Sequence, residues 1–363
     1  MVWMSLQKTE LSEVDLHAYS RQIVLKEIGY EGQRNLRNAK VCVVGLGGLG
    51  CPTVQQLTAI GVGYLRIVDR DVVDRSNLHR QYLYDTSQIG LPKVEAALQK
   101  LEKLNPDVEL DPQPLSVDHS NAKRVVEGMD VVVDGLDRIK PRYAVNQACA
   151  EQGIPYVFGA AIETFGSVST IIPKETACFE CFYSGVDDSL LPTCSVVGVH
   201  PSVTTIISSL EVSEAVRILV NNTPKLAGSL LFFDLESMQL DLINLTRRAD
   251  CNVCGENRIR VEESRQDIEI EEVCSRGGRR TFIVTPSKDL DLDLSSTRQI
   301  LRRRMQVEPK QTRLSLMFGL GGDVEITLLR TGICVLEGRM GEDSAVTEYR
   351  RLMSNIQPGL IDE

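Results

Sequence analysis

The sequence predicts an α/β protein: a doubly wound, Rossmann-like and mostly parallel sheet with an antiparallel extension, followed by a small C-terminal α+β domain. Over residues 1–255, short and almost wholly apolar segments alternate with amphipathic helical segments, as expected for a parallel sheet covered on both faces. A charged stretch poor in apolar residues, 256–266, then precedes a second series of strands and helices. We therefore expect a first, larger domain at 1–255, a linker at 256–266 and a small domain at 267–363.

The first elements show how the assignments are made. Ser12 to Asp15 forms a capping box, which begins a helix that carries Tyr19 and Arg21. The segment Lys-Val-Cys-Val-Val at 40–44 is predicted to be a strand buried on both faces of the sheet. The elements expected next are a helix at 53–60, a strand at 64–68, a helix at 93–104, a strand at 130–134, a helix at 142–152 and a strand at 155–159.

Two further segments, 166–173 and 228–245, are predicted to extend the sheet with antiparallel strands around a helix at 202–220. In the small domain we expect a hairpin (268–273 and 281–284), a helix (295–305), three strands (314–318, 324–329 and 333–337) and a final helix (342–353). This order is compatible with a ubiquitin-like fold, and a ferredoxin-like arrangement is the alternative. The role expected for this domain is partner recruitment.

Composition limits the functional classes. The 363 residues are 42% hydrophobic and 25% charged, as in ordinary soluble globular proteins. The net charge of −10 argues against nucleic acid and against an anionic membrane surface as partners. The sequence has no apolar segment long enough to span a membrane, and the N-terminus does not have the pattern of a signal peptide, so a cytoplasmic protein is expected.

A glycine cluster indicates a nucleotide site. Gly45, Gly47, Gly48 and Gly50 follow a predicted strand and begin a helix, which lets backbone N–H groups approach a phosphate. Asp69, at the end of the next strand, is placed to bind ribose hydroxyls. Taken alone, this pattern also fits an NAD-dependent oxidoreductase.

The segments that follow are unlike a dehydrogenase. They are Val-Asp-Arg-Asp at 68–71, Ser-Asn-Leu-His-Arg-Gln-Tyr at 76–82, Gly-Leu-Pro-Lys-Val at 90–94 and Asp-Gly-Leu-Asp at 134–137. With these motifs the sequence resembles the ubiquitin-activating superfamily, in its MoeB/ThiF/HesA-like branch, from about Tyr19 to Gly255. The family often has Asn after the last of these aspartates, whereas this chain has Arg138.

The resemblance implies a site for ATP and magnesium in which cations stabilise the charge that develops as pyrophosphate leaves. Arg80 and Lys93 would bind the phosphates and Asn77 would orient them. Asp137 would hold the magnesium, while Asp71 would assist Asp69 near the ribose or the metal. Arg21 matches an arginine that relatives insert into the partner subunit's site, which implies a homodimer.

Four cysteines form two pairs with metal-ligand spacing, Cys178 with Cys181 and Cys251 with Cys254. Four thiolates in this pattern suit a closed, structural zinc site. The alternatives are pairs of buried thiols and redox-active motifs, although the thioredoxin-like unit that redox motifs normally need is absent from the predicted elements.

Two other cysteines have possible chemical roles. Cys194 matches a cysteine in the family's crossover loop, and we hypothesise that it forms a thioester with the activated partner. Cys274 begins a Cys-x-x-Gly-x-Arg segment that resembles a rhodanese loop, but the strand predicted after it favours a hairpin turn.

The sequence therefore predicts ATP-dependent adenylylation of the C-terminal glycine of a ubiquitin-like protein ending in Gly-Gly, followed by thioester formation and transfer to a conjugating enzyme. The alternative within the superfamily is a sulfur-carrier adenylyltransferase that serves cofactor or tRNA thiolation. Outside it, a nucleotide-binding scaffold and an NAD(P) oxidoreductase are the other classes considered.

Overall fold

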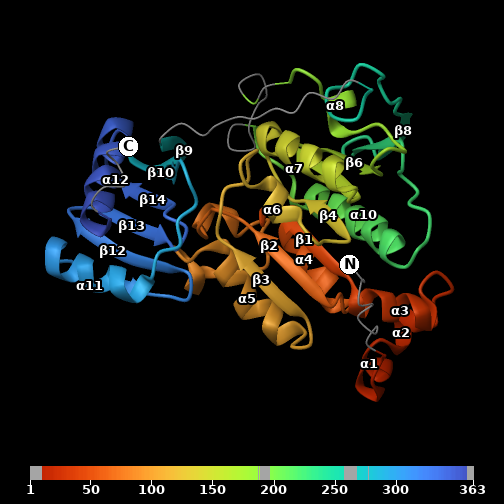
Figure 1. The fold of residues 1–363 in the computed structure, drawn as a ribbon, viewed down its shortest axis with the longest axis horizontal. Helices are drawn as coiled ribbons and strands as arrows, with labels where there is room; N and C mark the ends of the chain where they lie inside the picture. The colour runs from red at the N-terminus through yellow and green to blue at the C-terminus, as the bar shows by residue number, and fades with distance from the viewer. Residues whose placement is uncertain (1–9, 187, 189–196, 257–267, 277, 358–363) are drawn as a thin grey trace, which may run out of the picture.

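The computed structural model describes residues 10–186, 188, 197–256, 268–276 and 278–357. An eight-stranded sheet forms the centre of the first part of the chain, in the order β3-β2-β1-β4-β5-β6-β7-β8 (Figure 1). Neighbours from β3 to β5 are parallel, and those from β5 to β8 are antiparallel. The strands are β1 (Lys40–Val44), β2 (Tyr64–Val68), β3 (Glu109–Gln113), β4 (Val131–Asp134), β5 (Tyr156–Ile162), β6 (Phe165–Ile171), β7 (Ser229–Asp234) and β8 (Gln239–Asn244). The predicted fold class is confirmed.

Helices cover both faces of this sheet because strand side chains alternate between them. In β1, Val41 and Val43 belong to one buried cluster, and Cys42 and Val44 to another. The first cluster includes side chains of α4 (Gly50–Ala59), α5 (Lys93–Leu104) and α10 (Pro201–Leu219), and the second those of α6 (Ala122–Val126), α7 (Ile139–Gln152) and α8 (Phe179–Phe182). Short 3₁₀ turns at Arg75–Asn77 and Thr86–Gln88 connect β2 to α5.

The N-terminal segment forms three helices, α1 (Glu13–Ala18), α2 (Ser20–Ile23) and α3 (Gly29–Asn38). The capping box is confirmed: the Asp15 N–H donates to Ser12 Oγ at 3.1 Å, and the Ser12 N–H donates to the Asp15 carboxylate at 2.9 Å. The single continuous helix expected here is wrong, because the first helix ends at Ala18, with Tyr19 as its C-cap. The Tyr19 ring is buried, and its hydroxyl accepts a hydrogen bond from Asn105 at 2.7 Å.

A second sheet, in the order β11-β12-β13-β14-β10-β9, forms the centre of the C-terminal part, here called the second unit. Its strands are β9 (Ile268–Arg276), β10 (Arg279–Pro286), β11 (Lys310–Gln311), β12 (Ser315–Gly321), β13 (Val324–Leu329) and β14 (Cys334–Gly338), and its helices are α11 (Leu294–Met305) and α12 (Glu342–Ile356). All of its strand pairs are antiparallel.

The α+β character of the second unit is confirmed, but its detailed arrangement differs from both expectations. A ubiquitin-like sheet would contain a central parallel pair, whereas β10 pairs with β14 in antiparallel orientation. A ferredoxin-like fold would separate its first two strands by a helix, whereas β9 and β10 form a hairpin. The cause is the meander β12-β13-β14, which brings its last strand back beside β10 in the opposite direction.

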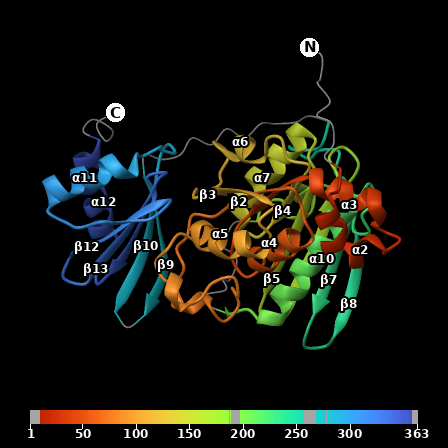
Figure 2. The same ribbon diagram turned by 90° about the horizontal axis from the view of Figure 1, so that it is seen from below.

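The second unit packs against the first beside β3 and α5 (Figures 1 and 2). Its helices and one face of its sheet form a separate apolar core. The other face includes Ile283 and Val335, which form a small cluster with Val72 of the first unit. Buried Glu95 of α5 accepts hydrogen bonds from the Thr312 hydroxyl and the Leu314 N–H at 2.7 and 2.9 Å. The two units therefore share a polar and apolar interface.

Candidate functional site

A large cleft in the described part of the chain lies where β1 and β4 end side by side, at the point where the strand order reverses. Ligands bind at such switch points in open α/β sheets because loops from neighbouring strands diverge there. The cleft has a volume of about 1930 Å³ and is lined by residues of both units. Most of the predicted site residues lie in it: Gly45, Gly47, Gly48, Asp69, Asp71, Asn77, Arg80, Lys93 and Asp137.

The glycine loop fits tightly between β1 and β4. Gly45 has a φ of +95°, and a Cβ there would lie 2.4 Å from the carbonyl oxygen of Gly135. Gly50 was predicted to contact the nucleotide, but it does not line the cleft among the described residues. A Cβ at Gly50 would lie 1.8 Å from the carbonyl oxygen of Gly45, so this glycine allows close packing at the start of α4 instead.

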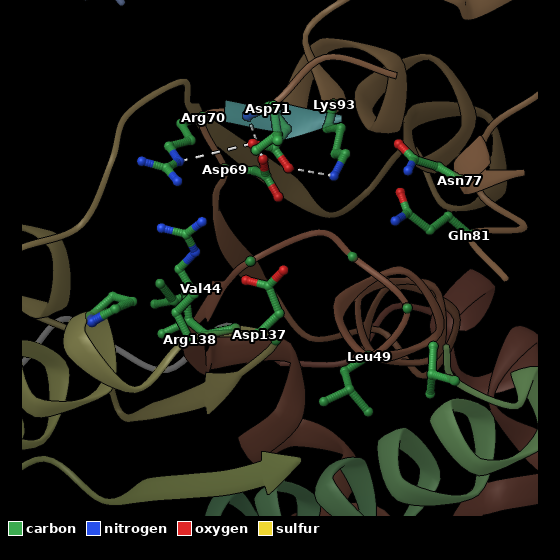
Figure 3. Close-up of a pocket in the computed structure, with 18 of the residues that line it drawn as sticks. Val44, Leu49, Asp69, Arg70, Asp71, Asn77, Gln81, Lys93, Asp137 and Arg138 are labelled. Atoms are coloured by element: carbon green, nitrogen blue, oxygen red, sulfur yellow. Dashed lines mark hydrogen bonds and ion pairs between the residues drawn. The ribbon is translucent and has the colours of Figure 1, made fainter. Parts of the chain in front are cut away.

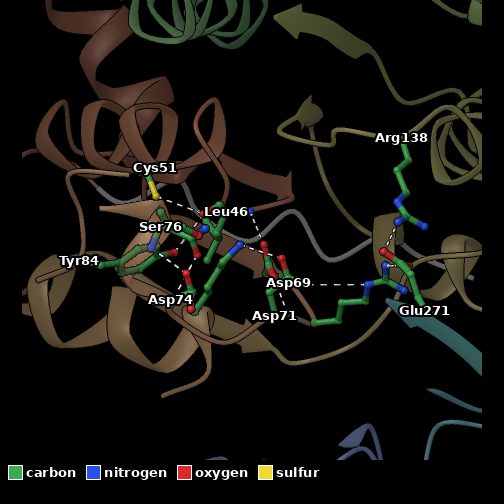
Figure 4. Close-up of polar contacts among 12 residues, drawn as sticks. Leu46, Cys51, Asp69, Asp71, Asp74, Ser76, Tyr84, Arg138 and Glu271 are labelled. Atoms are coloured by element: carbon green, nitrogen blue, oxygen red, sulfur yellow. Dashed lines mark hydrogen bonds and ion pairs between the residues drawn. The ribbon is translucent and has the colours of Figure 1, made fainter. Parts of the chain in front are cut away.

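Asp69 joins the glycine loop to the end of β2 (Figure 4). Its carboxylate accepts hydrogen bonds from the N–H groups of Leu46 and Asp71, both at 2.7 Å. Burial raises the pKa of Asp69 to about 6, although Lys93 acts in the opposite direction. Asp69 therefore fixes the loop and still faces the cleft.

Lys93, the first residue of α5, forms an ion pair with Asp71 at 2.7 Å (Figure 3). Burial acts to lower the pKa of Lys93, but Asp71 and Asp69 outweigh it and raise that pKa above its ordinary value. The ammonium group is thus kept charged in a largely buried position. A cation of this kind is suited to binding phosphate.

Asn77 and Arg80 lie on the loop between β2 and α5. The Asn77 side-chain oxygen accepts a hydrogen bond from the Asp74 N–H at 3.2 Å, and Arg80 Nη1 donates to the Ser76 carbonyl at 3.1 Å. Gln81, to which sequence reasoning gave no role, is 2% exposed and lines the cleft. Its side-chain oxygen has no hydrogen-bond partner among the described residues. A buried acceptor of this kind fits a polar ligand or a bound water.

Asp137 follows β4 and points into the cleft from the side opposite Lys93 (Figure 3). Two arginines that sequence reasoning did not place in the site, Arg70 and Arg138, line the same cleft. Both form ion pairs with Glu271 of β9. Arg138 was visible in the sequence as a departure from the family, but no local pattern connects it to a residue so distant in the chain.

The raised pKa of Asp69 predicts how nucleotide binding depends on pH. Above pH 6 the carboxylate is ionised and can accept hydrogen bonds, whereas below pH 6 one oxygen becomes a donor. We expect the affinity for ATP to fall by about fourfold between pH 7.5 and 5.5. Because protonation is easier in the folded chain than in the unfolded one, the same acidification should favour the fold through this group.

The measurement is the dissociation constant of ATP across this range for the wild type and for Asp69→Asn. The difference between the two profiles removes the titration of ATP itself. Parallel profiles would show that Asp69 does not control the dependence.

One predicted catalytic residue does not line the described cleft, and another lies outside the residues that the structure describes. Arg21 of α2 is exposed and is absent from the described residues that line it. Cys194 lies outside the described residues. Cys274 belongs to the strand β9, which pairs with β10, so the predicted hairpin is confirmed and the helix that a rhodanese loop requires does not follow.

The sulfur atoms of the four paired cysteines form one cluster. Their sulfur atoms lie within 4.8 Å of one another, with Cys178 and Cys251 at 3.6 Å and Cys181 and Cys254 at 3.4 Å. Zn–S bonds of about 2.3 Å in a tetrahedron give S···S distances of about 3.8 Å, close to these values. The donor set therefore fits a closed zinc site, which would connect α8 to the segment after β8.

No helix in the described ranges is long and apolar enough to cross a membrane.

Comparison with known proteins gives one family. A model of the ThiF family matches residues 19–253. The SAMP-activating enzyme E1 of Haloferax volcanii is 39% identical over 266 residues, which cover 73% of this chain and 97% of that protein. The sulfur carrier protein adenylyltransferase of Thermus thermophilus is 37% identical over 248 residues, covering 67% of this chain and 92% of that protein.

Other matches extend this picture. The adenylyltransferase and sulfurtransferase MOCS3 of Culex quinquefasciatus is 35% identical over 290 residues, covering 79% of this chain, and this chain spans 64% of that protein's length. Among solved structures, E. coli MccB with MccA-N7isoASN has a TM-score of 0.60 at 22% identity, covering 66% of this chain and 75% of that chain. This last likeness concerns the fold alone.

Proposed function

Because the chain belongs to the ThiF family, whose relatives include adenylyltransferases, we propose that it uses ATP to adenylylate the C-terminal carboxylate of a ubiquitin-like protein. The observation that carries this proposal is the convergence of the glycine loop, Asp69, Lys93 and Asp137 in one cleft. A carboxylate oxygen of the partner attacks the α-phosphorus of ATP, the bond to the β-phosphate breaks, and pyrophosphate leaves with its electron pair.

Each part of the cleft has a role in this proposal. The glycine loop and the start of α4 bind phosphate through backbone N–H groups, and Asp69 accepts hydrogen bonds from the ribose. Lys93 and Arg80 stabilise the charge that moves onto pyrophosphate, and Asn77 orients the phosphates. Asp137 would hold magnesium, which would neutralise the leaving group when bound, and Asp71, which lines the same cleft, would assist near the metal or the ribose.

The class of partner is supported by the relatives. One of them is named as a SAMP-activating enzyme and another as a sulfur carrier protein adenylyltransferase. We propose a partner ending in Gly-Gly, whose adenylate then reacts with Cys194: the thiolate attacks the acyl carbon, a thioester forms, and AMP leaves. Transfer to a conjugating enzyme would follow. If Cys194→Ala still forms a thioester that reducing agents cleave, the assignment of this cysteine fails.

A second candidate function is supported by the same comparisons. In a sulfur-carrier pathway, the sulfur of a donor at the oxidation level of hydrosulfide would attack the acyl carbon of the adenylate, AMP would leave, and a thiocarboxylate would form on the partner. Mass spectrometry of the partner after reaction separates the two, because a thiocarboxylate stays on the partner while a thioester moves to a cysteine of another protein.

Arg21 belongs to the homodimer part of this proposal, because it is exposed and does not line the described cleft of its own chain. The mass of the protein in solution tests the dimer directly, since a single chain has a mass of 40.3 kDa. A monomer that is fully active would remove the proposed role of Arg21 in a partner's site.

The proposed function is tested by ATP–pyrophosphate exchange with a panel of ubiquitin-like proteins ending in Gly-Gly. Exchange should require one of these partners, and Asp137→Ala should lower it by about 10²-fold or more, because charge on the leaving group is no longer neutralised. Glu236→Ala, an exposed substitution outside the residues that line the cleft, serves as the control. Partner-dependent exchange that Asp137→Ala leaves intact would contradict the assigned site.

A further inference from the structure

The second unit places one carboxylate in the cleft of the first. One oxygen of Glu271 accepts a hydrogen bond from Arg70 Nη2, and the other accepts one from Arg138 Nη2 (Figure 4). The side chains of Glu271 and Arg70 are only 13% and 18% exposed. Two guanidinium groups are thus held on either side of a single carboxylate that comes from a distant part of the chain.

The position of this cluster along a bound nucleotide follows from the proposed function, on which the present inference rests. Phosphates would lie at the glycine loop and the ribose at Asp69, so the base lies beyond Asp69. Arg70 directly follows Asp69, and its Nη1 donates to the hydroxyl of Ser116, just after β3, at 3.3 Å. The two arginines therefore lie at the end of the cleft that is left for the base.

The chemistry of adenylylation explains neither arginine. Arg138 stands where the family resemblance leads one to expect asparagine, and Arg70 is not needed for phosphate or ribose. Both are bound to Glu271, which lies beyond residue 253, where the ThiF family match ends. Arg138, the residue that departs from the family pattern, is thus paired with a carboxylate that lies outside the ThiF family match.

The negative charge of Glu271 offsets the positive charges of the two arginines in this partly buried site. Burial acts to lower the pKa of Arg70, but the charges of Glu271 and Asp71 outweigh it and raise that pKa. Without the carboxylate, the charge of largely buried Arg70 would be left to repel that of Arg138, which is 37% exposed. A guanidinium held in place can stack on an aromatic ring, because it is planar and positively charged.

We propose that Glu271 holds Arg70 and Arg138 as a wall for the adenine base of ATP, so that the second unit completes the nucleotide site. In this arrangement Glu271 is a positioning residue, and the arginines contact the ligand. Affinity for the nucleotide and docking of the second unit are then coupled, and the coupling is reciprocal. Binding of ATP should make the β9 strand more resistant to hydrogen exchange.

The experiment compares ligands with and without a base on the full-length Glu271→Gln protein, by isothermal titration calorimetry. ATP and AMP should bind about tenfold more weakly than to the wild type. Inorganic triphosphate, which has no base, should bind as well as before or slightly better, because a negative charge has been removed. Equal loss for all three ligands would overturn the base wall, and so would no loss for ATP.

Glu272→Gln is the matched control, because Glu272 lies on the same strand and also lines the cleft, but its ion pair is with Arg280 of β10 inside the second unit. It should bind ATP like the wild type, and an equal loss there would mean that weakening the hairpin is the cause. Combining Arg138→Gln with Glu271→Gln should cost little more than Glu271→Gln alone, since Arg138 contributes to binding only while Glu271 holds it in place. Additive losses would contradict the proposal.

These outcomes separate this inference from the proposed function. A wild-type protein that binds no ATP and gives no exchange with any partner would defeat both. A wild type that binds ATP and gives exchange, with Glu271→Gln equal to it for ATP and AMP, would defeat only the role of Glu271. Melting temperatures of all variants identify any that have lost their fold.

Discussion

Replacing Lys93 by methionine is expected to lower partner-dependent ATP–pyrophosphate exchange by about 10²- to 10³-fold. The lysine is 6% exposed and lies in the cleft with its ammonium group 2.7 Å from Asp71. Methionine keeps much of the side-chain volume but removes the cation that would stabilise charge on the leaving pyrophosphate. The measurement is the exchange rate at saturating ATP and partner.

The same substitution leaves Asp71 without its cation, so it should also lower the free energy of unfolding by about 2 kcal/mol, less than for a fully buried pair because Asp71 is 35% exposed. Adding Asp71→Asn removes the unpaired charge and should restore much of that stability without restoring exchange. If exchange returned with stability, Lys93 would be a structural residue and not a phosphate-binding one.

The second large effect concerns the cysteine cluster. Replacing Cys251 by serine should abolish binding of the one zinc ion expected per chain and lower the melting temperature by about 10 °C, because metal binding contributes directly to folding stability. Cys251 is 2% exposed, and its sulfur lies 3.6 Å from that of Cys178. Elemental analysis of the purified protein and thermal denaturation give the two readouts.

Cys149→Ala is the matched control, because Cys149 is buried in the same apolar cluster but is not one of the four grouped thiols. It should keep zinc and lose stability only through a small cavity. A Cys251→Ser protein that melts like the wild type, or a wild type without zinc when prepared with the metal present, would remove the structural role assigned to the cluster.

The sequence predicts the first sheet well where its strands are buried on both faces. The segment at 40–44 has the short, almost wholly apolar pattern that is typical of a strand buried on both faces, and it is a strand with the same bounds. The strand β3 has no such signal because it is polar, half-exposed and contains Pro112. It forms because its backbone pairs with β2, which is a tertiary effect.

The site is predictable to the extent that its residues belong to local motifs. The glycine loop, Asp69, Lys93 and Asp137 are placed by short segments whose chemistry is evident. Glu271 is not, since nothing near it in the chain indicates a partner in the cleft. The strand arrangement of the second unit cannot be predicted from local sequence for a related reason. Whether β10 and β14 pair parallel or antiparallel depends on chain reversals that lie between them.

The cysteine cluster also bears on how the protein is made. Cys181 and Cys254 are 73 residues apart, and α10, β7 and β8 lie between them. At a translation rate of about 5–20 residues per second, roughly 4–15 s separate the synthesis of the two cysteine pairs. During that interval the nascent chain has two thiol ligands and an unfinished sheet edge. Capture of the zinc ion that this cluster fits would therefore belong to the last stage of folding of the first unit, and zinc supply during synthesis would then set the yield of folded protein.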